Sequence, residues 1–354
     1  MRNEQASRDT APAGSIRFNT DSSKMEIYNG DKWWEIDSTS PESQTGGTRG
    51  LWAGGNTPTY FNNIQYVNIS TTGNTADFGD LNRMGNAMEA VSSRTRALYG
   101  GTFRPAGGGS SGSPYAADNV IDYVTITSTG NATDFGDLTV ERSAAAPMQN
   151  STRGLWGGGY RQDPAATYYD TIDYVTMAST GNAVDFGNFA QDQAYGLSGC
   201  SPTRGVVGRA PVTPAGAKVN TIAYVTLATT GNAADFGDTT TVDTGPQGTS
   251  SNAVRAVFWT SSYAPVTTDV IDYITIATLG NAVDFGTMNH ISMNGSGACA
   301  SSTRSVCGGG YDGGIQEELE YIQIMTTGNS VDFGNLHEAR SQPGACSNGH
   351  GGLG

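Results

Sequence analysis

Six Asp-Phe-Gly triplets are the first residues in this sequence to consider for chemistry. Their aspartates are Asp77, Asp134, Asp185, Asp235, Asp284 and Asp332. Such a triplet can hold a metal ion when a set of catalytic signature motifs accompanies it, and that set is absent here. Because a unit of packed strands needs a Phe in its core and a Gly at a bend, we predict that the triplet is structural.

A Thr-Arg turn also recurs six times. Its arginines are Arg49, Arg96, Arg153, Arg204, Arg255 and Arg304, with Val254 in place of the Thr in one copy. The first five triplet aspartates each precede the next of these arginines by 19 or 20 residues. One hypothesis is a belt of ion pairs between the two sets. The alternative is that both groups are solvated and contribute little to stability.

Other candidates for catalysis are few. The three histidines, His290, His337 and His350, lack the spacing of metal ligands, and neither G-x-S-x-G nor H-E-x-x-H occurs. Carboxylates in variable segments could serve a glycosidase, but acidic residues are common in loops. These are Asp163, Asp170, Asp269 and Asp312. We predict that the protein is not an enzyme, has no metal site and needs no cofactor.

Aromatic residues gather in the segments of variable length. They are Tyr60, Phe61, Phe103, Tyr115, Tyr160, Tyr168, Tyr169, Tyr263 and Tyr311. Rings held on rigid loops suit the recognition of a sugar or a protein, although each ring could instead pack against its own strands. The segment 101–119 is the longest of these loops. We therefore predict a receptor-binding sector made of Phe103, Arg104, Tyr115, Tyr160, Arg161, Tyr168 and Tyr169.

The elements that position these residues repeat with a period near fifty. In one copy, 143–148 is rich in small residues, 154–159 ends in glycines, 172–177 contains Ile-Asp-Tyr, and 183–187 ends in Asp-Phe-Gly. Four short antiparallel strands repeated in this way predict the blades of a β-propeller. The first copy lacks the small-residue strand, and 341–348 supplies one with no copy after it. We therefore predict an all-β chain in which 49–354 forms six blades, closed by 341–348.

Composition excludes some classes of partner. The formal net charge of −14 argues against nucleic acid, which requires clustered Lys and Arg. No run of about 18 apolar residues is present, so we expect no membrane insertion. The polar N-terminus has no signal-peptide pattern, which favours assembly in a cytoplasm.

The N-terminal part differs from the repeats. Ile16/Phe18, Met25/Ile27 and Trp34/Ile36 alternate with polar residues, and Asn29-Gly30 favours a hairpin, so 15–37 predicts a three-stranded β-meander. So few residues cannot enclose a core. We expect 1–37 to be an anchoring and oligomerisation module, with its apolar face covered by another chain, followed by a linker at 38–48.

Two resemblances suggest what the protein does. The strands with Arg-Ser-Ala-Ala-Ala, Leu-Trp-Gly-Gly-Gly and Ile-Asp-Tyr resemble kelch repeats over residues 49–350, with Asp-Phe-Gly where kelch usually has a Trp. The segment Gly14–Gly30, with Trp33-Trp34-Glu35, is similar to a segment of structural proteins, especially fibres, of tailed bacteriophages. The phrase Tyr-Val-Thr-Ile-x-Ser-Thr-Gly-Asn-Ala-x-Asp-Phe-Gly-Asp-Leu likewise resembles repeats in phage structural proteins.

These resemblances imply a virion protein, most simply a tail or fibre component that displays a propeller to a glycan or protein of the host surface. They also imply contacts with other virion proteins through 1–48 and a homo-oligomer, with a trimer favoured. Two alternatives remain open. One is a capsid or neck decoration protein with a purely structural role, and the other is a propeller enzyme that degrades glycans.

Overall fold

The computed structural model describes residues 11–19, 24–36, 48–105, 115–162, 165–208, 219–242, 248–260, 268–289, 295–311 and 313–353. The chain divides into two compact units, Met1–Gly46 and Gly47–Gly354. The expected linker residues 38–47 lie outside the described residues, as do Asp163, Asp312, Tyr263 and His290. The prediction of an all-β chain is confirmed, since no α-helix occurs in the described ranges. It follows that these ranges hold no helix able to span a membrane.

The N-terminal unit is an antiparallel meander of three strands. These are β1 (Ile16–Asn19), β2 (Lys24–Tyr28) and β3 (Trp33–Ile36). On one face Arg17 forms an ion pair with Glu26 at 2.6 Å, and its guanidinium lies 4.1 Å from the centre of the Trp33 ring. The opposite face exposes Ile16, Phe18, Met25, Ile27 and Trp34.

The described residues of the larger unit form six antiparallel sheets of four or five strands, which we name A to F in the order of their second strands. The first strands are β30 (Gly344–Ser347), β9 (Glu89–Ser92), β13 (Ala146–Gln149), β18 (Leu197–Cys200), β22 (Thr249–Ser251) and β26 (Gly297–Ala300). The second strands are β4 (Arg49–Ala53), β10 (Arg96–Pro105), β14 (Arg153–Gly157), β19 (Arg204–Gly208), β23 (Arg255–Trp259) and β27 (Arg304–Gly308).

The third strands of sheets A to F are β7 (Asn63–Asn68), β11 (Tyr115–Thr125), β16 (Thr167–Thr176), β20 (Thr221–Thr226), β24 (Val270–Thr275) and β28 (Glu318–Gln323). The fourth are β8 (Ala76–Asp80), β12 (Thr133–Asp137), β17 (Val184–Gln193), β21 (Ala234–Asp238), β25 (Val283–Thr287) and β29 (Val331–Asn335). Sheet A gains the hairpin β5 (Asn56–Thr57) and β6 (Thr59–Tyr60) beside it, and sheet C gains β15 (Tyr160–Arg161).

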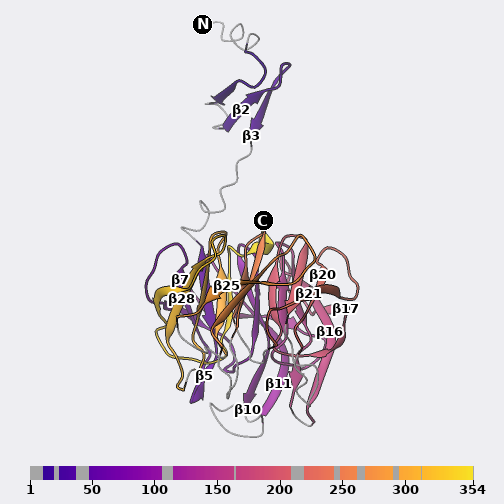
Figure 1. Ribbon diagram of the computed structural model, residues 1–354, viewed down its shortest axis with the longest axis vertical. Helices are drawn as coiled ribbons and strands as arrows, with labels where there is room; N and C mark the ends of the chain where they lie inside the picture. The colour runs from indigo at the N-terminus through magenta and orange to yellow at the C-terminus, as the bar shows by residue number, and fades with distance from the viewer. Residues whose placement is uncertain are drawn as a thin grey trace. The chain divides into compact units, whose positions relative to one another are not determined.

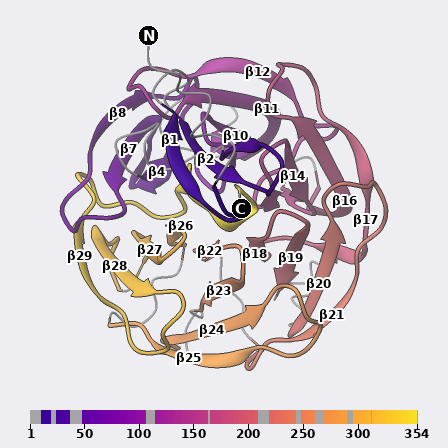
Figure 2. The same ribbon diagram turned by 90° about the horizontal axis from the view of Figure 1, so that it is seen from above.

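Sheet A joins the two ends of the repeat region. The C-terminal strand β30 pairs antiparallel with β4, with Gly344 opposite Ala53 and Ser347 opposite Gly50. This strand lies within 341–348 and pairs where the sequence predicts. The first strands of successive sheets contact one another in a closed cycle, from β30 through β9, β13, β18, β22 and β26 back to β30. Figure 2 shows the sheets following one another around a common centre.

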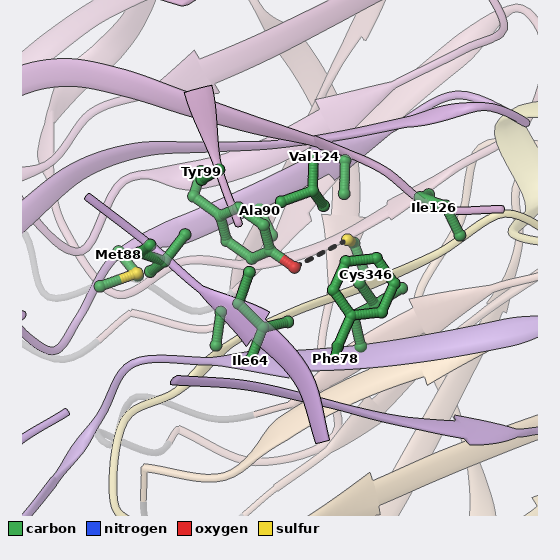
Figure 3. Packing of buried hydrophobic residues seen from close by; sticks show 13 residues of the cluster. Ile64, Phe78, Met88, Ala90, Tyr99, Val124, Ile126 and Cys346 are labelled. Carbon is green, nitrogen blue, oxygen red and sulfur yellow. Dashed lines mark hydrogen bonds between the residues drawn. The ribbon is translucent and has the colours of Figure 1, made fainter. Parts of the chain in front are cut away.

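The hydrophobic core is divided among the spaces between neighbouring sheets. Between sheets A and B, for example, Ile64 and Phe78 pack against Tyr99 and Val124, with Cys346 beside the Tyr99 hydroxyl (Figure 3). Five further clusters fill the spaces B–C, C–D, D–E, E–F and F–A. All four cysteines are buried and free within these layers. Burial of apolar surface therefore holds each sheet to both of its neighbours.

The repeated triplet forms hydrogen bonds between neighbouring sheets. The Gly181 amide of a Thr-Gly-Asn turn donates to the Phe135 carbonyl of the preceding sheet at 2.8 Å, and the Asn182 side chain accepts from the Asp137 amide at 3.1 Å. Equivalent bonds occur at all six sheet-to-sheet contacts. Gly136 has a φ of 145°, and a Cβ there would lie 2.5 Å from the Gly181 carbonyl oxygen. This contact explains why the triplet ends in glycine.

The hypothesis of an ion-pair belt is wrong. No ion pair joins the triplet aspartates to the turn arginines among the described residues, and all six aspartates are exposed. Each arginine instead lies over the Tyr of its own sheet and donates to a backbone carbonyl of the next. Arg153, for instance, lies 4.7 Å from the Tyr174 ring centre and 3.0 Å from the Leu227 oxygen. The delocalised guanidinium suits both contacts.

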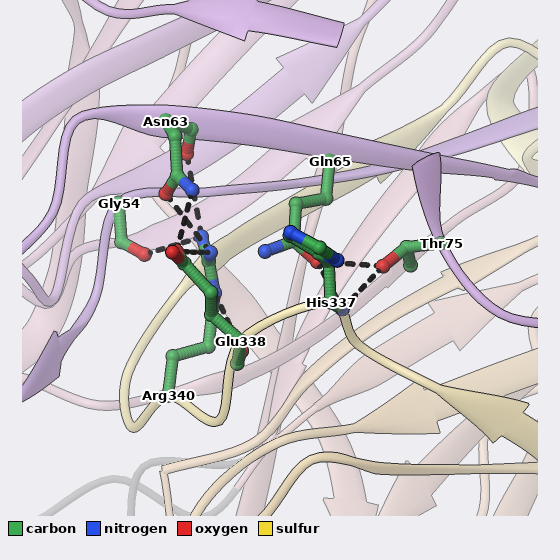
Figure 4. A network of polar contacts seen from close by, with 7 residues as sticks. All are labelled: Gly54, Asn63, Gln65, Thr75, His337, Glu338 and Arg340. Atoms are coloured by element: carbon green, nitrogen blue, oxygen red, sulfur yellow. Dashed lines mark hydrogen bonds and ion pairs between the residues drawn. The ribbon is translucent and has the colours of Figure 1, made fainter. Parts of the chain in front are cut away.

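Buried polar groups complete the contact between sheets F and A. Arg340 follows the last strand of sheet F and donates to the Gly54 carbonyl and the Asn63 side chain of sheet A, both at 2.9 Å (Figure 4). Burial lowers the pKa of Arg340 to about 10. The His337 amide donates to Thr75 at 2.7 Å. Hydrogen bonds of this kind offset the cost of burying polar groups.

Candidate recognition surface

The two ends of the larger unit differ in what their residues do. The Thr-Arg and Thr-Gly-Asn turns lie at one end, the turn end, where they bind neighbouring sheets as described above. The segments between second and third strands lie at the other end, the loop end. Figure 1 shows β5, β10 and β11 reaching this end, with the C-terminus at the opposite one. Because the repeated turn residues already have partners, the loop end offers the residues that are free to differ.

The C-terminal segment closes the centre of the molecule at the turn end. After β30, the chain forms a short 3₁₀ helix, η2 (Gly351–Leu353), which contacts β18 and β22. His350 is buried, and its Nδ1 accepts from the Gly352 amide at 3.1 Å, so Nε2 donates to the Ser92 carbonyl at 2.7 Å. Burial lowers the pKa of His350 to about 4. The imidazole is therefore neutral at pH 7 and serves to hold the segment in place.

Three of the predicted aromatic side chains come together at the loop end. Phe103 on β10 stacks on Tyr115 on β11, with ring centres 5.0 Å apart and planes 26° apart. Tyr60 of the β6 strand meets Tyr115 edge-on, at 6.4 Å. Desolvation raises the pKa of Tyr60, with a further contribution from Tyr115. The β10–β11 hairpin continues to Pro105, where Phe103 lies opposite Ala117 and Pro105 opposite Tyr115, so the rings of Phe103 and Tyr115 are diagonal neighbours across the pair.

A second group of aromatic side chains lies next to the first at the loop end. Tyr160 and Tyr168 face each other across the β15–β16 pair with ring centres 5.0 Å apart. These two rings, with Phe103 and Tyr195, pack against a small buried cluster formed by Ala87, Ala144 and Ala194. We define the aromatic sector as Tyr60, Phe103, Tyr115, Tyr160, Tyr168 and Tyr195. All six are half-buried, so each is braced on one side and presents the other to solvent.

Three predicted residues do not join the aromatic sector. Arg104 donates to Asp118 at 3.1 Å, and Arg83 binds the same carboxylate oxygen at 2.9 Å. Arg104 is thus committed to an internal ion pair. Tyr169 follows Tyr168 on the same strand, and successive strand residues point to opposite faces, so it belongs to a different surface. Arg161 lies opposite Thr167 at the edge of the β15–β16 pair.

A cavity opens beside the aromatic sector, on the axis around which the sheets are arranged. Its volume is about 40 Å³, and its lining includes Ala87, Glu89, Tyr195, Thr249 and Gln342. Ala87 belongs to the alanine cluster beneath the aromatic rings, and Tyr195 belongs to the aromatic sector itself. The cavity and the sector therefore form one continuous surface.

Backbone in the left-handed conformation occurs at three residues of the cavity lining and at Ala144, which is hydrogen-bonded to one of them. Ala87, Ala144, Tyr195 and Gln342 all have positive φ, between 49° and 61°, at equivalent positions before the first strands. Their amides donate around the axis, from Ala144 to the Ala87 carbonyl at 2.7 Å and from Ala87 to the Gln342 carbonyl at 3.0 Å. Left-handed conformations cost of order 1–3 kcal/mol at non-glycine residues and often mark ligand sites.

Sequence reasoning missed three members of this surface. Tyr195 lies just before a first strand, outside the variable loops, and its left-handed conformation gives no signal in the sequence. Ala87 resembles any small residue of the repeat. Glu89 did have a signal, because it is an acidic residue in a strand that carries small or apolar residues in the other copies.

No cluster of three His, Cys, Asp or Glu residues able to hold a metal ion occurs in the described part of the chain. Two of the loop carboxylates considered for catalysis lie apart: Asp170 is in β16 of sheet C, and Asp269 directly precedes β24 of sheet E. Comparisons with known proteins give no family: no family model matches the chain, and no curated protein matches it.

Proposed function

We propose that the larger unit is a six-bladed β-propeller whose loop end binds a molecule on the surface of a host cell. The closed cycle of first strands, the pairing of β30 with β4, and cores placed between successive sheets support the propeller. A propeller displays its variable loops on a rigid frame, which suits recognition.

One observation carries the recognition function. Half-buried aromatic rings form a continuous sector at the loop end, beside an axial cavity, whereas the repeated residues of the turn end are engaged between sheets. Rings braced in this way lose little conformational entropy when a ligand binds, and Tyr offers both an apolar face and a hydroxyl. Host-surface glycans and proteins are the ligand classes that such a surface fits.

The proposal includes a place for the protein: a tail or fibre of a tailed bacteriophage, as the resemblances in both parts of the sequence imply. The exposed apolar face of the N-terminal meander supports an anchoring role, because Ile16, Phe18 and Trp34 are each more than half exposed. An apolar face on so small a sheet is expected to be covered in an assembly. We propose that other virion proteins, or further copies of this chain in a trimer, cover it.

Two experiments test the proposal. Immunogold labelling of intact particles should place the chain on the tail, and labelling on the capsid would favour a decoration role. Purified full-length protein added to host cells should block phage adsorption. Protein that binds the cells but does not compete with the phage would contradict a role in attachment.

A further inference from the structure

The axial cavity lies toward the loop end, because its lining residues precede or begin the first strands of the sheets. A deeper cavity of about 30 Å³ continues along the axis and shares Pro147, Thr249 and Ala298 with the first. His350 lines the deeper cavity but not the first one, and η2 closes the passage beyond it. A ligand group that enters from the loop end can contact Tyr195, which belongs both to the cavity lining and to the aromatic sector.

Glu89 is the feature of this pocket that the repeat does not explain. The equivalent residues, by strand register, are Ala146, Leu197, Gly248, Gly297 and Gly344, none of which ionises. The Glu89 backbone carbonyl accepts a hydrogen bond from the Trp156 indole at 3.0 Å, but its carboxyl has no hydrogen bond or ion pair to any described residue.

Burial raises the pKa of Glu89 to about 8, because the surrounding protein penalises the charged form. The other residues lining the pocket include one further titratable group, Tyr195, and no Lys or Arg. An unpaired carboxyl of this kind destabilises the fold wherever it ionises. The five equivalent positions show that the architecture does not need it, so a ligand is the simplest reason for its presence.

Size and charge select the class of ligand. A water molecule needs roughly 10–15 Å³ of such volume, so about 40 Å³ holds some three waters, or one small head group with its attached carbon, but no sugar ring. A single carboxylate is too few ligands for a divalent cation. Thr249, Ser296 and Gln342 add neutral oxygen acceptors to the lining of the same cavity. Carboxylate and neutral acceptors together match the three N–H donors of an ammonium group.

We propose that the Glu89 pocket binds a primary ammonium group carried by the molecule recognised at the loop end. This inference rests on the proposed function only in taking the loop end as the binding face. The ammonium would bind the ionised carboxylate, so a proton leaves Glu89 as the ligand enters. Affinity should then rise as pH rises through about 8, and fall once the amine itself loses its proton.

The test uses full-length protein and n-butylammonium chloride in calorimetric titrations at pH 6 and pH 8.5. Wild-type protein should bind more tightly at pH 8.5, where the Glu89 carboxyl is largely ionised, and should release a proton on binding at pH 6, where the carboxyl is protonated. Glu89→Gln should weaken binding at pH 8.5 at least tenfold. Glu141→Gln, which removes an exposed carboxylate from the connection between sheets B and C, should leave it unchanged. Glu89→Gln keeps the shape of the side chain and removes an unpaired charge, so we expect it to fold.

Absence of saturable binding, or equal affinity in Glu89→Gln, would overturn the inference. Two further probes distinguish the sources of the amine. A lysine-containing peptide should bind like butylammonium if a protein receptor supplies the group, whereas preference for glucosamine would indicate an amino sugar at the mouth. Adsorption assays on aromatic-sector variants test the proposed function separately. The amine titrations can fail while the adsorption assays succeed, and the adsorption assays can fail while the amine titrations succeed.

Discussion

Replacing Gly136 with Ala tests the contact on which the repeat motif depends. Its φ of 145° is a conformation that essentially only glycine adopts, which costs an L-residue about 1–3 kcal/mol. In addition, the new Cβ would lie 2.5 Å from the Gly181 carbonyl oxygen. Ordinary contact needs close to 1 Å more, so the turn of the next sheet must move away.

That movement lengthens the bonds between the two sheets. Gly181 donates to Phe135 at 2.8 Å, and Asp137 donates to Asn182 at 3.1 Å. At about 1 kcal/mol for each bond, we expect Gly136→Ala to cost about 2 kcal/mol beyond the strain at φ. Gly181→Ala is the matched control, because its φ of 154° imposes similar strain while no atom lies within 4 Å of the added Cβ.

Thermal unfolding of the full-length variants, followed by circular dichroism and by tryptophan fluorescence, measures the difference. Gly136→Ala should unfold about 3–5 °C below Gly181→Ala, at roughly 2 °C for each kcal/mol in a unit of this size. Equal melting temperatures for the two variants would show that the triplet glycine is present for its φ alone. The account of the motif as a contact between sheets would then be refuted.

Three further predictions follow from two carboxyl groups and from the closing strand. Because the pKa of Glu89 is raised in the folded protein, its contribution to stability is fully present below the unfolded pKa near 4.5 and is lost as pH rises through about 8. In urea unfolding, Glu89→Gln should therefore have the same free energy of unfolding as wild type at pH 4 and a higher one at pH 9, by of order 2–4 kcal/mol. A difference that does not change with pH would contradict this. Asp173→Asn should lower the free energy of unfolding by about 3–5 kcal/mol, because Arg142, which is fully buried and 2.7 Å away, loses its counter-ion. The control Asp134→Asn, at an exposed position, should lower it by less than about 0.5 kcal/mol in the same assay. Deletion of 344–354 should expose the edge of β4 and cause aggregation in light scattering, which a monodisperse truncated protein would disprove.

Much of the fold follows from the sequence because the repeat is dense in local signals. Glycine doublets, the Thr-Gly-Asn turn and the alternation in Ile-Asp-Tyr strands locate the strands, and the two incomplete ends locate the pairing of β30 with β4. The interaction partners of the charged residues could not be predicted from the sequence. Asp134 and Arg153 share a spacing that suggests an ion pair, but the arginine lies over Tyr174 and reaches the next sheet, a contact defined only in three dimensions.

The candidate site was predictable in part for the same reason. Phe103, Tyr115, Tyr160 and Tyr168 lie in variable loops, and loop position alone brings them to one end. Tyr195 joins them through a left-handed backbone that depends on a hydrogen bond to the Ala144 carbonyl, 2.8 Å away in the neighbouring sheet. Side-chain direction along a strand separated Tyr168 from Tyr169, and the Arg104 guanidinium, although partly exposed, is engaged by Asp118.

Competition for adsorption to host cells tests the central claim most directly. Full-length Tyr115→Ala/Tyr168→Ala should lose the ability to block phage adsorption, because both rings belong to the aromatic sector. Tyr311→Ala, which removes a half-exposed ring from sheet F outside that sector, should compete as well as wild type. Full competition by the double variant, with its fold intact by circular dichroism, would contradict recognition at the aromatic sector.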